Sequence, residues 1–561
     1  MTKLAPHISL PGLLLDRASD APLNQQLYTG LASLILNGRL KPGTRLPSTR
    51  TLADELGVAR NTVSVAFDQL LAEGYVESRI GSGTKVTVQL PDGVRAPDAA
   101  MSVAASSHRR RKQPSRRGLR LASTRTSASN PDCRWMPLAL GGPSFDLFPS
   151  KLWARLLYVQ LTRWRGRLLG YGDPAGWPPL REAIATYVGE ARAVRAAPDR
   201  VIVVSGSQQA LDLAARVLLD PGDTVLVEDP GYRGARAALT AAGARLQPVA
   251  IDGEGMCIAT NGMRSIRARA ACLTPSHQFP LGPTMSLGRR LKFLQWAERT
   301  DAWIFEDDYD SEFRYVGRPL AALQGLDTTG RVIYIGTFSK VLSPALRLGF
   351  IILPEHLVDA FATARAITDR HSPLLEQAAL ATFITDGHFA RHIRRMRAAY
   401  AERQSVLLAA ADRHLDGLLE VKPAEAGMHL IGWLPAGIDD EEVARRANAE
   451  GIGITSLSAC YVRRPQRGGL IMGYAGTPPD QIDKSVAILG RVLRSVRRDY
   501  ELTHASEVTP VRQRQPNVQT SLPRSRSKLG IVSNQRHKVH DYEEVAPAPN
   551  ALSGVSRNVT R

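Results

Sequence analysis

Four short apolar runs recur through the middle of the chain, and each is followed by a polar or glycine-containing turn. These runs are Val201–Val204, Thr224–Val227, Ala302–Phe305 and Val332–Ile335. Short apolar strands that alternate with helical stretches are typical of an α/β domain built on a largely parallel sheet. Binding sites in such sheets lie beyond the carboxyl ends of the strands. The pattern therefore predicts both a fold class and the edge of the sheet where functional side chains gather.

Two polar segments of low complexity divide the 561 residues into parts. We expect a small N-terminal domain over 16–90, a flexible basic linker over 91–133, a large α/β domain over 134–500 and a disordered tail over 501–561. The linker and the tail are rich in Ser, Ala, Pro and other polar residues, and their apolar residues are not periodic. Chains of that composition bury too little apolar surface to fold.

The formal net charge of +19 points to a polyanionic partner, but much of this charge lies in the linker and the tail. The linker holds nine Lys or Arg and three Asp, and the tail holds nine basic and five acidic residues. The simpler interpretation is a pair of solvated, flexible segments. The alternative is that the cluster His108–Lys112 adds contacts to phosphate. Charge alone does not establish nucleic-acid binding.

Several other classes of protein are disfavoured. No run of about 18 apolar residues predicts a membrane-spanning helix, and Met1–Asp20 lacks the pattern of a secretion signal. The four cysteines, Cys133, Cys257, Cys272 and Cys460, form no CxxC pair, which disfavours a zinc site or a disulfide framework. We therefore expect a cytoplasmic protein that binds neither metal nor membrane.

The N-terminal domain shows three helical patterns and a hairpin. The apolar positions are Leu27, Leu31, Leu34 and Ile35 in the first helix and Leu52, Ala53 and Leu56 in the second. In the third helix we expect Val63, Phe67, Leu70 and Leu71 to face inward. Ser48 is the expected N-cap of the second helix, and the third begins near Arg60. Alternating patterns over 75–80 and 84–88, around Gly81-Ser82-Gly83, predict a β-hairpin. Three helices and a hairpin make a winged helix-turn-helix.

The third helix is the expected sequence-reading element, because its polar N-terminal end is free to enter a major groove. The run 46–63, continued by Gly74-Tyr75 and 81–84, closely resembles the DNA-binding domain of GntR-family bacterial regulators. The resemblance implies contacts to double-stranded DNA from Ser48, Arg50, Arg60, Asn61, Thr62 and the wing around Gly81. The alternative is a small helical domain with a polar face.

In the large domain, each apolar run leads into residues that carry chemistry. The segment 205–210 opens a helix, where backbone N–H groups form either an anion site or a plain cap. Further along the chain, the segment 228–233 contains an aromatic residue, and the segment 306–313 contains several carboxylates. The segment 336–340 ends in a lysine, and Arg347 follows seven residues later. A lysine can form a Schiff base, a buried carboxylate can face a pyridinium, and an arginine can clamp phosphate. Singly these features are ordinary, but their ordered set matches what pyridoxal 5′-phosphate (PLP) requires.

The large domain resembles fold-type I aminotransferases over about 350 residues. The variants in 274–282, 306–313 and 336–340, joined to a GntR-type head, resemble the MocR/GabR regulators. The resemblance implies that Lys340 carries the cofactor, Asp307 faces its pyridine nitrogen, Tyr309 bonds the ring oxygen and Tyr232 stacks on the ring. It also implies a phosphate site that comprises Ser207, Gln208, Thr337, Ser339 and Arg347.

Two features depart from the aminotransferase pattern. Aminotransferases usually have an Asn-Pro-Thr-Gly segment whose Asn contacts the ring oxygen, whereas 279–282 reads Phe-Pro-Leu-Gly, with His277 or Gln278 as candidate substitutes. The arginine expected to clamp a substrate carboxylate is absent from 469–475. Arg463, Arg464 and Arg467 are the alternatives nearby.

We therefore expect a PLP-dependent, DNA-binding transcriptional regulator, homodimeric as the resemblance implies, that senses an amine, an amino acid or PLP itself. The runner-up is an active aminotransferase with an appended DNA-binding domain. A degenerate body that serves only as a scaffold is disfavoured, because Lys340, Asp307 and Arg347 are all present. We expect transamination by the body to be weak or absent.

Overall fold

The computed structural model describes residues 15–17, 19, 21–79, 83–88, 114–124, 136–257, 267–317, 320–463 and 465–505. Its contacts divide the chain into two units, Met1–Arg125 and Thr126–Arg561. Within the predicted linker, the described residues include a short helix, α4 (Arg116–Ser123). At the other end, the last helix continues to Ala505, past position 500.

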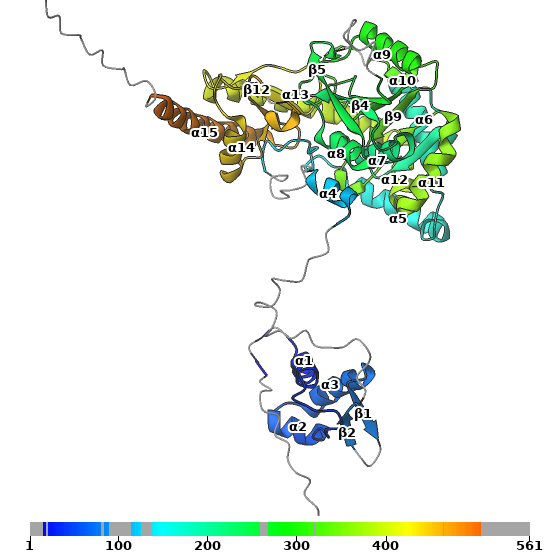
Figure 1. Ribbon diagram of the computed structural model, residues 1–561, viewed down its shortest axis with the longest axis vertical. Coiled ribbons are helices and arrows are strands. Elements are labelled where there is room, and N and C mark those ends of the chain that lie inside the picture. Colours follow the sequence, from blue (N-terminus) through cyan, green and yellow to red (C-terminus); the bar gives the residue numbers. More distant parts are fainter. Residues whose placement is uncertain are drawn as a thin grey trace, which may run out of the picture. The chain divides into compact units, whose positions relative to one another are not determined.

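The N-terminal unit is a winged helix-turn-helix, as the sequence predicts (Figure 1). It contains α1 (Leu23–Leu36), α2 (Thr49–Leu56), α3 (Arg60–Ala72), β1 (Val76–Arg79) and β2 (Gly83–Val86). The Ser48 hydroxyl accepts the backbone N–H of Thr51 at 3.1 Å, which caps α2. Gly57, in the left-handed conformation with φ 63°, ends this helix and turns the chain toward α3.

The core of this unit follows the predicted apolar positions with one correction. Leu27, Leu31, Leu52, Val63, Phe67 and Leu70 are buried, but Leu71 is 44% exposed. Ala66 occupies the inward position instead. Positions 63, 66, 67 and 70 form one stripe of a helix with 3.6 residues per turn, and position 71 lies about 100° around the axis from position 70. The expectation that Leu71 faces inward was therefore wrong.

The second unit is built on an eight-stranded sheet with the order β3-β10-β9-β8-β7-β4-β5-β6. The strands are β3 (Val201–Val204), β4 (Thr224–Asp229), β5 (Arg245–Asp252), β6 (Gly255–Met256), β7 (Ala270–Leu273), β8 (Trp303–Asp308), β9 (Val332–Thr337) and β10 (Gly349–Ile352). The pairs from β9 through β8, β7 and β4 to β5 are parallel. β10 is antiparallel to both of its neighbours, so β3 points the same way as β9. The predicted largely parallel sheet is confirmed.

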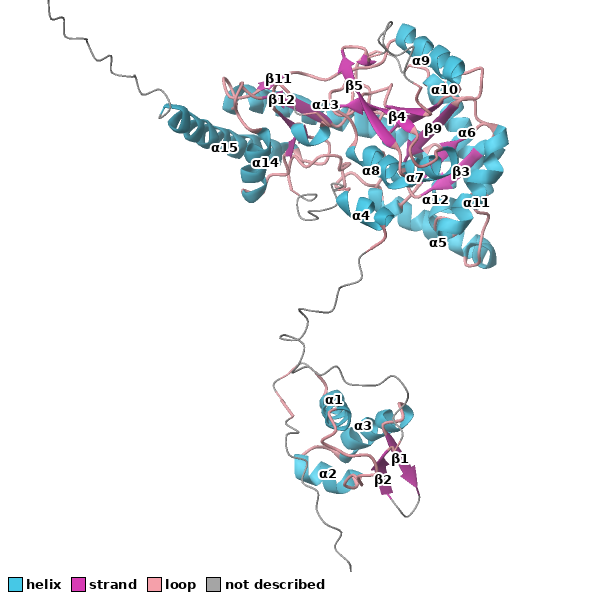
Figure 2. Cartoon of the chain, viewed as in Figure 1, coloured by secondary structure: helices cyan, strands magenta, loops and turns pink. Residues whose placement is uncertain are grey.

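Helices cover both faces of this sheet, as Figure 2 shows. They are α5 (Ser150–Leu168), α6 (Pro178–Arg192), α7 (Ser207–Leu218), α8 (Arg233–Ala242), α9 (Leu287–Thr300), α10 (Leu323–Leu326), α11 (Val358–Asp369) and α12 (Leu374–Thr385). Successive residues of a strand point to opposite faces. On β3, for example, Val201 and Val203 belong to the core that includes α6 and α12, whereas Ile202 and Val204 pack with α7 and α11.

A smaller four-stranded sheet follows, with the order β11-β12-β14-β13. Its strands are β11 (Glu420–Val421), β12 (His429–Trp433), β13 (Thr455–Ser456) and β14 (Gly469–Gly473), and its helices are α13 (His388–His414), α14 (Asp440–Ala449) and α15 (Pro479–Ala505). Among the residues described, no helix has both the length and the apolar character needed to cross a membrane.

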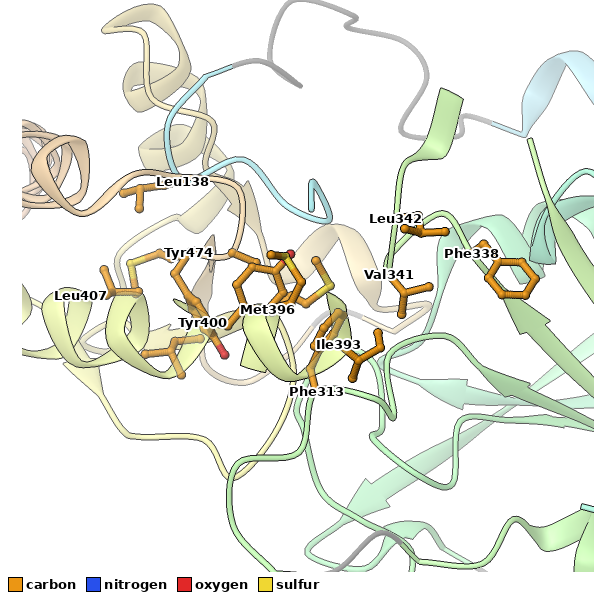
Figure 3. Packing of buried hydrophobic residues seen from close by; sticks show 14 of the residues in the cluster. Leu138, Phe313, Phe338, Val341, Leu342, Ile393, Met396, Tyr400, Leu407 and Tyr474 are labelled. Atoms are coloured by element: carbon orange, nitrogen blue, oxygen red, sulfur yellow. The ribbon is translucent and has the colours of Figure 1, made fainter. Parts of the chain in front are cut away.

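Buried residues join the two sheets into one core (Figure 3). Val341 and Leu342, each 1% exposed, belong to the same core as Met396 and Tyr400 of α13. Because these two side chains directly follow Lys340, the packing fixes the backbone that carries this lysine.

Candidate cofactor site and nucleic-acid interface

The predicted cofactor residues meet at one edge of the large sheet. β3, β4, β7, β8 and β9 run in the same direction, so their carboxyl ends share this edge. Asp307 is the penultimate residue of β8, and the segments that follow β3, β4, β7 and β9 carry Ser207, Tyr232, His277 and Lys340, respectively. The sheet therefore collects groups that lie up to 133 positions apart in the sequence.

The start of α7 forms a small cradle. Its N-cap, Gly206, has φ 105°, a conformation that glycine adopts easily. A Cβ atom at Gly206 would lie 3.6 Å from Ser339 Oγ, 3.7 Å from Thr337 Oγ1 and 4.0 Å from Arg347 Nη2. Two hydroxyls and a guanidinium thus surround a helix N-terminus, where N–H groups favour an anion. Within the described residues, the exposed Arg347 side chain forms no ion pair.

Lys340 and Asp307 supply the two groups of opposite charge. Lys340 Nζ donates to the Gly141 carbonyl oxygen at 2.9 Å. Asp307 is 4% exposed, and its Oδ1 atom has no hydrogen-bond partner among the described residues. Burial, reinforced by Asp308 and other nearby carboxylates, raises the pKa of Asp307 to about 7, although Lys340 opposes the shift. A buried carboxylate oxygen without a donor is well suited to accept a proton-bearing nitrogen.

The other acids of the segment 306–312 have partners within the protein. Glu306 accepts the backbone N–H groups of Leu323 and Gln324, both at 2.8 Å. Asp308 Oδ2 accepts Arg192 Nε at 3.0 Å, and Glu312 accepts the Tyr187 hydroxyl at 2.7 Å. Asp308 Oδ1 also lacks a donor, but the Oδ2 atom of the same carboxylate pairs with Arg192. Asp307 differs from these three acids in that no described residue forms a hydrogen bond or an ion pair with its carboxylate.

Two tyrosines border the site. The Tyr232 hydroxyl donates to Gln208 Oε1 at 3.3 Å, and Gln208 Nε2 donates to the Gly234 carbonyl at 3.0 Å. Burial and the proximity of Asp307 raise the pKa of Tyr232 to about 12. The Tyr309 hydroxyl lies 3.0 Å from His277 Nδ1, and the same nitrogen lies 2.9 Å from Asp310 Oδ2. Asp310 thus orients the imidazole beside Tyr309.

An aromatic cluster, which sequence reasoning missed, encloses this edge. Phe279 packs against Tyr232, Tyr309 and His429, with ring centroids 5.9, 6.0 and 5.7 Å away, respectively. His429 comes from β12 of the smaller sheet, and its Nε2 donates to the Pro280 carbonyl at 2.8 Å. Burial and the neighbouring His277 lower the pKa of His429 to about 4, so this ring is neutral near pH 7. No local motif marks His429, since tertiary packing alone brings it here.

Their contacts distinguish the candidate residues at the two places where the sequence departs from the aminotransferase pattern. Gln278 is fully buried, and its amide nitrogen donates to the Pro230 carbonyl at 2.9 Å and to Glu228 Oε2 at 3.3 Å. These bonds occupy Gln278, whereas His277 contacts Tyr309. Arg467 donates to the Leu434 carbonyl at 2.8 Å and pairs with Glu420 at 3.0 Å, on the smaller sheet. The backbone N–H of Arg463 approaches Asp229 at 3.3 Å, and Arg464 lies outside the described residues.

The predicted DNA-contacting residues gather around the starts of α2 and α3. Ser48, Arg50, Arg60 and Asn61 are exposed, and Thr62 is half-buried. Arg60 Nε lies 3.4 Å from Thr49 Oγ1, which links the two helix starts. Gly81 lies outside the described residues. The four exposed side chains are therefore accessible for contact with nucleic acid.

Two family models match the chain. Residues 23–86 match the gntR family of bacterial regulatory proteins, and residues 135–489 match aminotransferase class I and II. A probable rhizopine catabolism regulatory protein, MocR, from Rhizobium meliloti is 45% identical over 84% of this chain and 94% of its own length. The HTH-type transcriptional regulator TauR from Rhodobacter capsulatus is 33% identical over 87% of this chain and 100% of its own length.

A solved structure extends the comparison to the large domain. The α-aminoadipate aminotransferase LysN from Thermus thermophilus, complexed with N-(5′-phosphopyridoxyl)-L-leucine, matches with a TM-score of 0.63. The match covers 69% of this chain and 98% of LysN at 29% identity. The predicted aminotransferase-like fold is confirmed. The groups at the sheet edge are chemically compatible with PLP, because they comprise an amine, a buried carboxylate without a donor, and an anion cradle.

Proposed function

Because the chain belongs to the MocR-type family of transcriptional regulators, with a GntR-type head and an aminotransferase-like body, we propose that this DNA-binding regulator senses its effector through PLP. The supporting observation is that Lys340 and the donor-free Oδ1 of Asp307 share the sheet edge with the cradle at Gly206. The effector would be an amine, an amino acid or the cofactor itself.

The residues of this chain would divide the work of holding PLP. Lys340 would bind it covalently, and Asp307 would balance the charge of its pyridine nitrogen. Ser207, Gln208, Thr337, Ser339 and Arg347 would surround its phosphate. When bound, PLP supplies an aldehyde that condenses reversibly with amines.

Aromatic groups would hold the ring in place. Tyr232 would stack on it, and Tyr309 would donate to its phenolic oxygen. We assign to His277 the supporting role that an asparagine has in aminotransferases, because its Nδ1 already contacts Tyr309 at 3.0 Å. Asp310, 2.9 Å from the same nitrogen, would keep this imidazole oriented.

The head would read double-stranded DNA through Arg50, Arg60, Asn61 and Thr62, supported by Ser48 and by the wing around Gly81. We propose a homodimer, since two heads would recognise repeated half-sites. We also propose a cytoplasmic location, where bacterial DNA is found. Effector binding can change DNA binding only if the effector favours one arrangement of the protein over another.

The test is the Lys340→Ala variant of the full chain. The wild-type protein incubated with PLP should gain a visible absorbance band and, after borohydride reduction, a stable cofactor adduct. Lys340→Ala should gain neither but should keep its fold by circular dichroism. Lys292→Ala, which removes an exposed lysine of α9, is the matched control and should behave as wild type. A reducible adduct in Lys340→Ala would refute the assignment.

An active aminotransferase is the second candidate, favoured by the joint presence of Lys340 and Asp307. Turnover also requires a substrate held so that its Cα–H faces a general base. β14 offers no arginine for a substrate carboxylate, and Phe279 replaces the usual asparagine. We therefore propose ligand binding with negligible turnover.

A further inference from the structure

A third extended segment joins the wing of the N-terminal unit. The backbone N–H of Leu46 donates to the Thr84 carbonyl at 2.9 Å, and that of Val86 donates to the Thr44 carbonyl at 2.9 Å. These bonds flank an antiparallel bridge between Arg45 and Lys85. The two residues therefore form a non-hydrogen-bonded pair, the position at which opposite side chains come closest.

This pairing places two positive charges directly opposite each other. Like charges at such a position destabilise a sheet. On the other side, Lys85 faces Glu77 of β1, but the Glu77 carboxylate also pairs with Arg79 at 3.7 Å. In the described part of the chain, neither the Arg45 nor the Lys85 side chain forms a hydrogen bond or an ion pair. An external anion bound to both side chains would therefore reduce the repulsion between Arg45 and Lys85.

The Arg45 guanidinium also lies on the wing itself. A Cβ atom at Gly83 would lie 2.9 Å from Arg45 Nε and 3.1 Å from Nη2. Gly83 has φ 76° and carries no side chain, so the planar group can lie against the first residue of β2. Arg45 is exposed and Lys85 is half-buried, so both cations remain accessible to a ligand (β2 is seen beside β1 in Figure 2).

We propose that Arg45 and Lys85 together bind a DNA backbone phosphate, an inference that rests on the proposed DNA-reading function of the head. A guanidinium and an ammonium on one face of the wing match a phosphate that carries one negative charge. Their contact is independent of sequence, whereas the N-terminal end of α3 reads bases. The wing thereby fixes the position of the head on the duplex while α3 supplies specificity.

The experiment compares the salt dependence of DNA affinity for full-length wild-type protein and the Arg45→Gln and Lys85→Gln variants. Two duplexes are used: a genomic fragment selected by the wild-type protein and an unrelated sequence. The slope of log affinity against log salt should fall by about 0.9 for each phosphate that the variant no longer neutralises. Both duplexes should lose affinity to a similar extent. Arg39→Gln removes an exposed arginine after α1 and should leave the slope unchanged.

The charge-conserving variant Arg45→Lys should retain most of the slope, because it keeps the positive charge. Lys85→Gln provides the test alone if Arg45→Gln does not fold, as judged by thermal unfolding. If the wild-type protein binds the selected fragment and both glutamine variants keep the wild-type slope, the phosphate contact is overturned. The proposed function would still stand. Failure of the wild-type protein to bind any duplex would overturn both.

Discussion

Lys340 Nζ lies 2.9 Å from the carbonyl oxygen of Gly141, a residue 199 positions earlier in the chain. Gly141 has φ 82°, and a Cβ atom on it would lie 2.5 Å from the same Nζ. The segment before α5 therefore closes over the lysine, and only a glycine leaves room for it. No sequence motif around Lys340 indicates this contact.

Gly141→Ala should displace the Lys340 amine and lower the affinity for PLP by at least about tenfold, which corresponds to about 1.4 kcal/mol. Titration of cofactor-free protein with PLP, followed by absorbance, measures the change. Gly142→Ala is the matched control, because its nearest contact would be Phe145 at 3.9 Å. Equal affinities for the two variants would show that Gly141 does not constrain the lysine.

Arg347→Gln should weaken binding of PLP by about 10–150-fold, as expected for a charge-assisted hydrogen bond worth about 1.5–3 kcal/mol. The same variant should bind pyridoxal, which lacks the phosphate, as the wild-type protein does. Calorimetric titration with both compounds separates a phosphate contact from a general loss of the site. A similar loss for both compounds would remove Arg347 from the cradle.

Asp307 should make the stability of cofactor-free protein depend on pH. Its pKa is about 7 in the folded protein, whereas the ordinary value of 3.8 applies when the chain is unfolded. Between these values the folded state holds more protons, so this contribution to the free energy of unfolding decreases as pH rises from about 4 to about 7. The slope is at most about 1.4 kcal/mol per pH unit.

Denaturant unfolding of wild type and Asp307→Asn at several pH values checks this expectation. The asparagine variant should lose less stability across the interval, and bound PLP should reduce the slope of the wild-type protein. Burial also raises the pKa values of Glu228 and Glu306 to about 7. Both residues are present in both proteins, so their contributions to the pH dependence of stability cancel in the comparison. Parallel curves would mean that Asp307 is ionised throughout.

In the head, Arg60→Ala should weaken specific DNA binding by about 1–3 kcal/mol if its contact is a bidentate pairing with a base. Its affinity for unrelated duplexes should change much less. Fluorescence anisotropy with the two kinds of duplex gives both values. Unchanged affinity for the selected fragment would exclude Arg60 from the contacts.

Local patterns were sufficient to predict the features that depend on neighbouring residues. The Ser48 cap, the start of α3 at Arg60, the strand that carries Asp307 and the strand before Lys340 all follow from residues a few positions away. Leu71 was misplaced, because an apolar residue next to a buried stripe can still face solvent, where it is 44% exposed.

The features that were missed depend on long-range packing. His429 reaches Phe279 from another sheet, and Gly141 reaches Lys340 from a segment before α5. Likewise, the sequence left His277 and Gln278 as alternatives, and only the bonds of Gln278 to Pro230 and Glu228 separate them. Periodicity carries no information about such contacts.

The most direct test of the central claim records cofactor absorbance and DNA affinity in the same titration with a panel of amines and amino acids. Full-length protein loaded with PLP is titrated in the presence of a selected genomic fragment, with a keto acid added in a parallel series. We expect an effective ligand to change the spectrum and the DNA affinity over the same concentration range, with fewer than about one turnover per site, and to do neither in Lys340→Ala. Many turnovers per site with unchanged DNA affinity would contradict a sensing role and favour an aminotransferase.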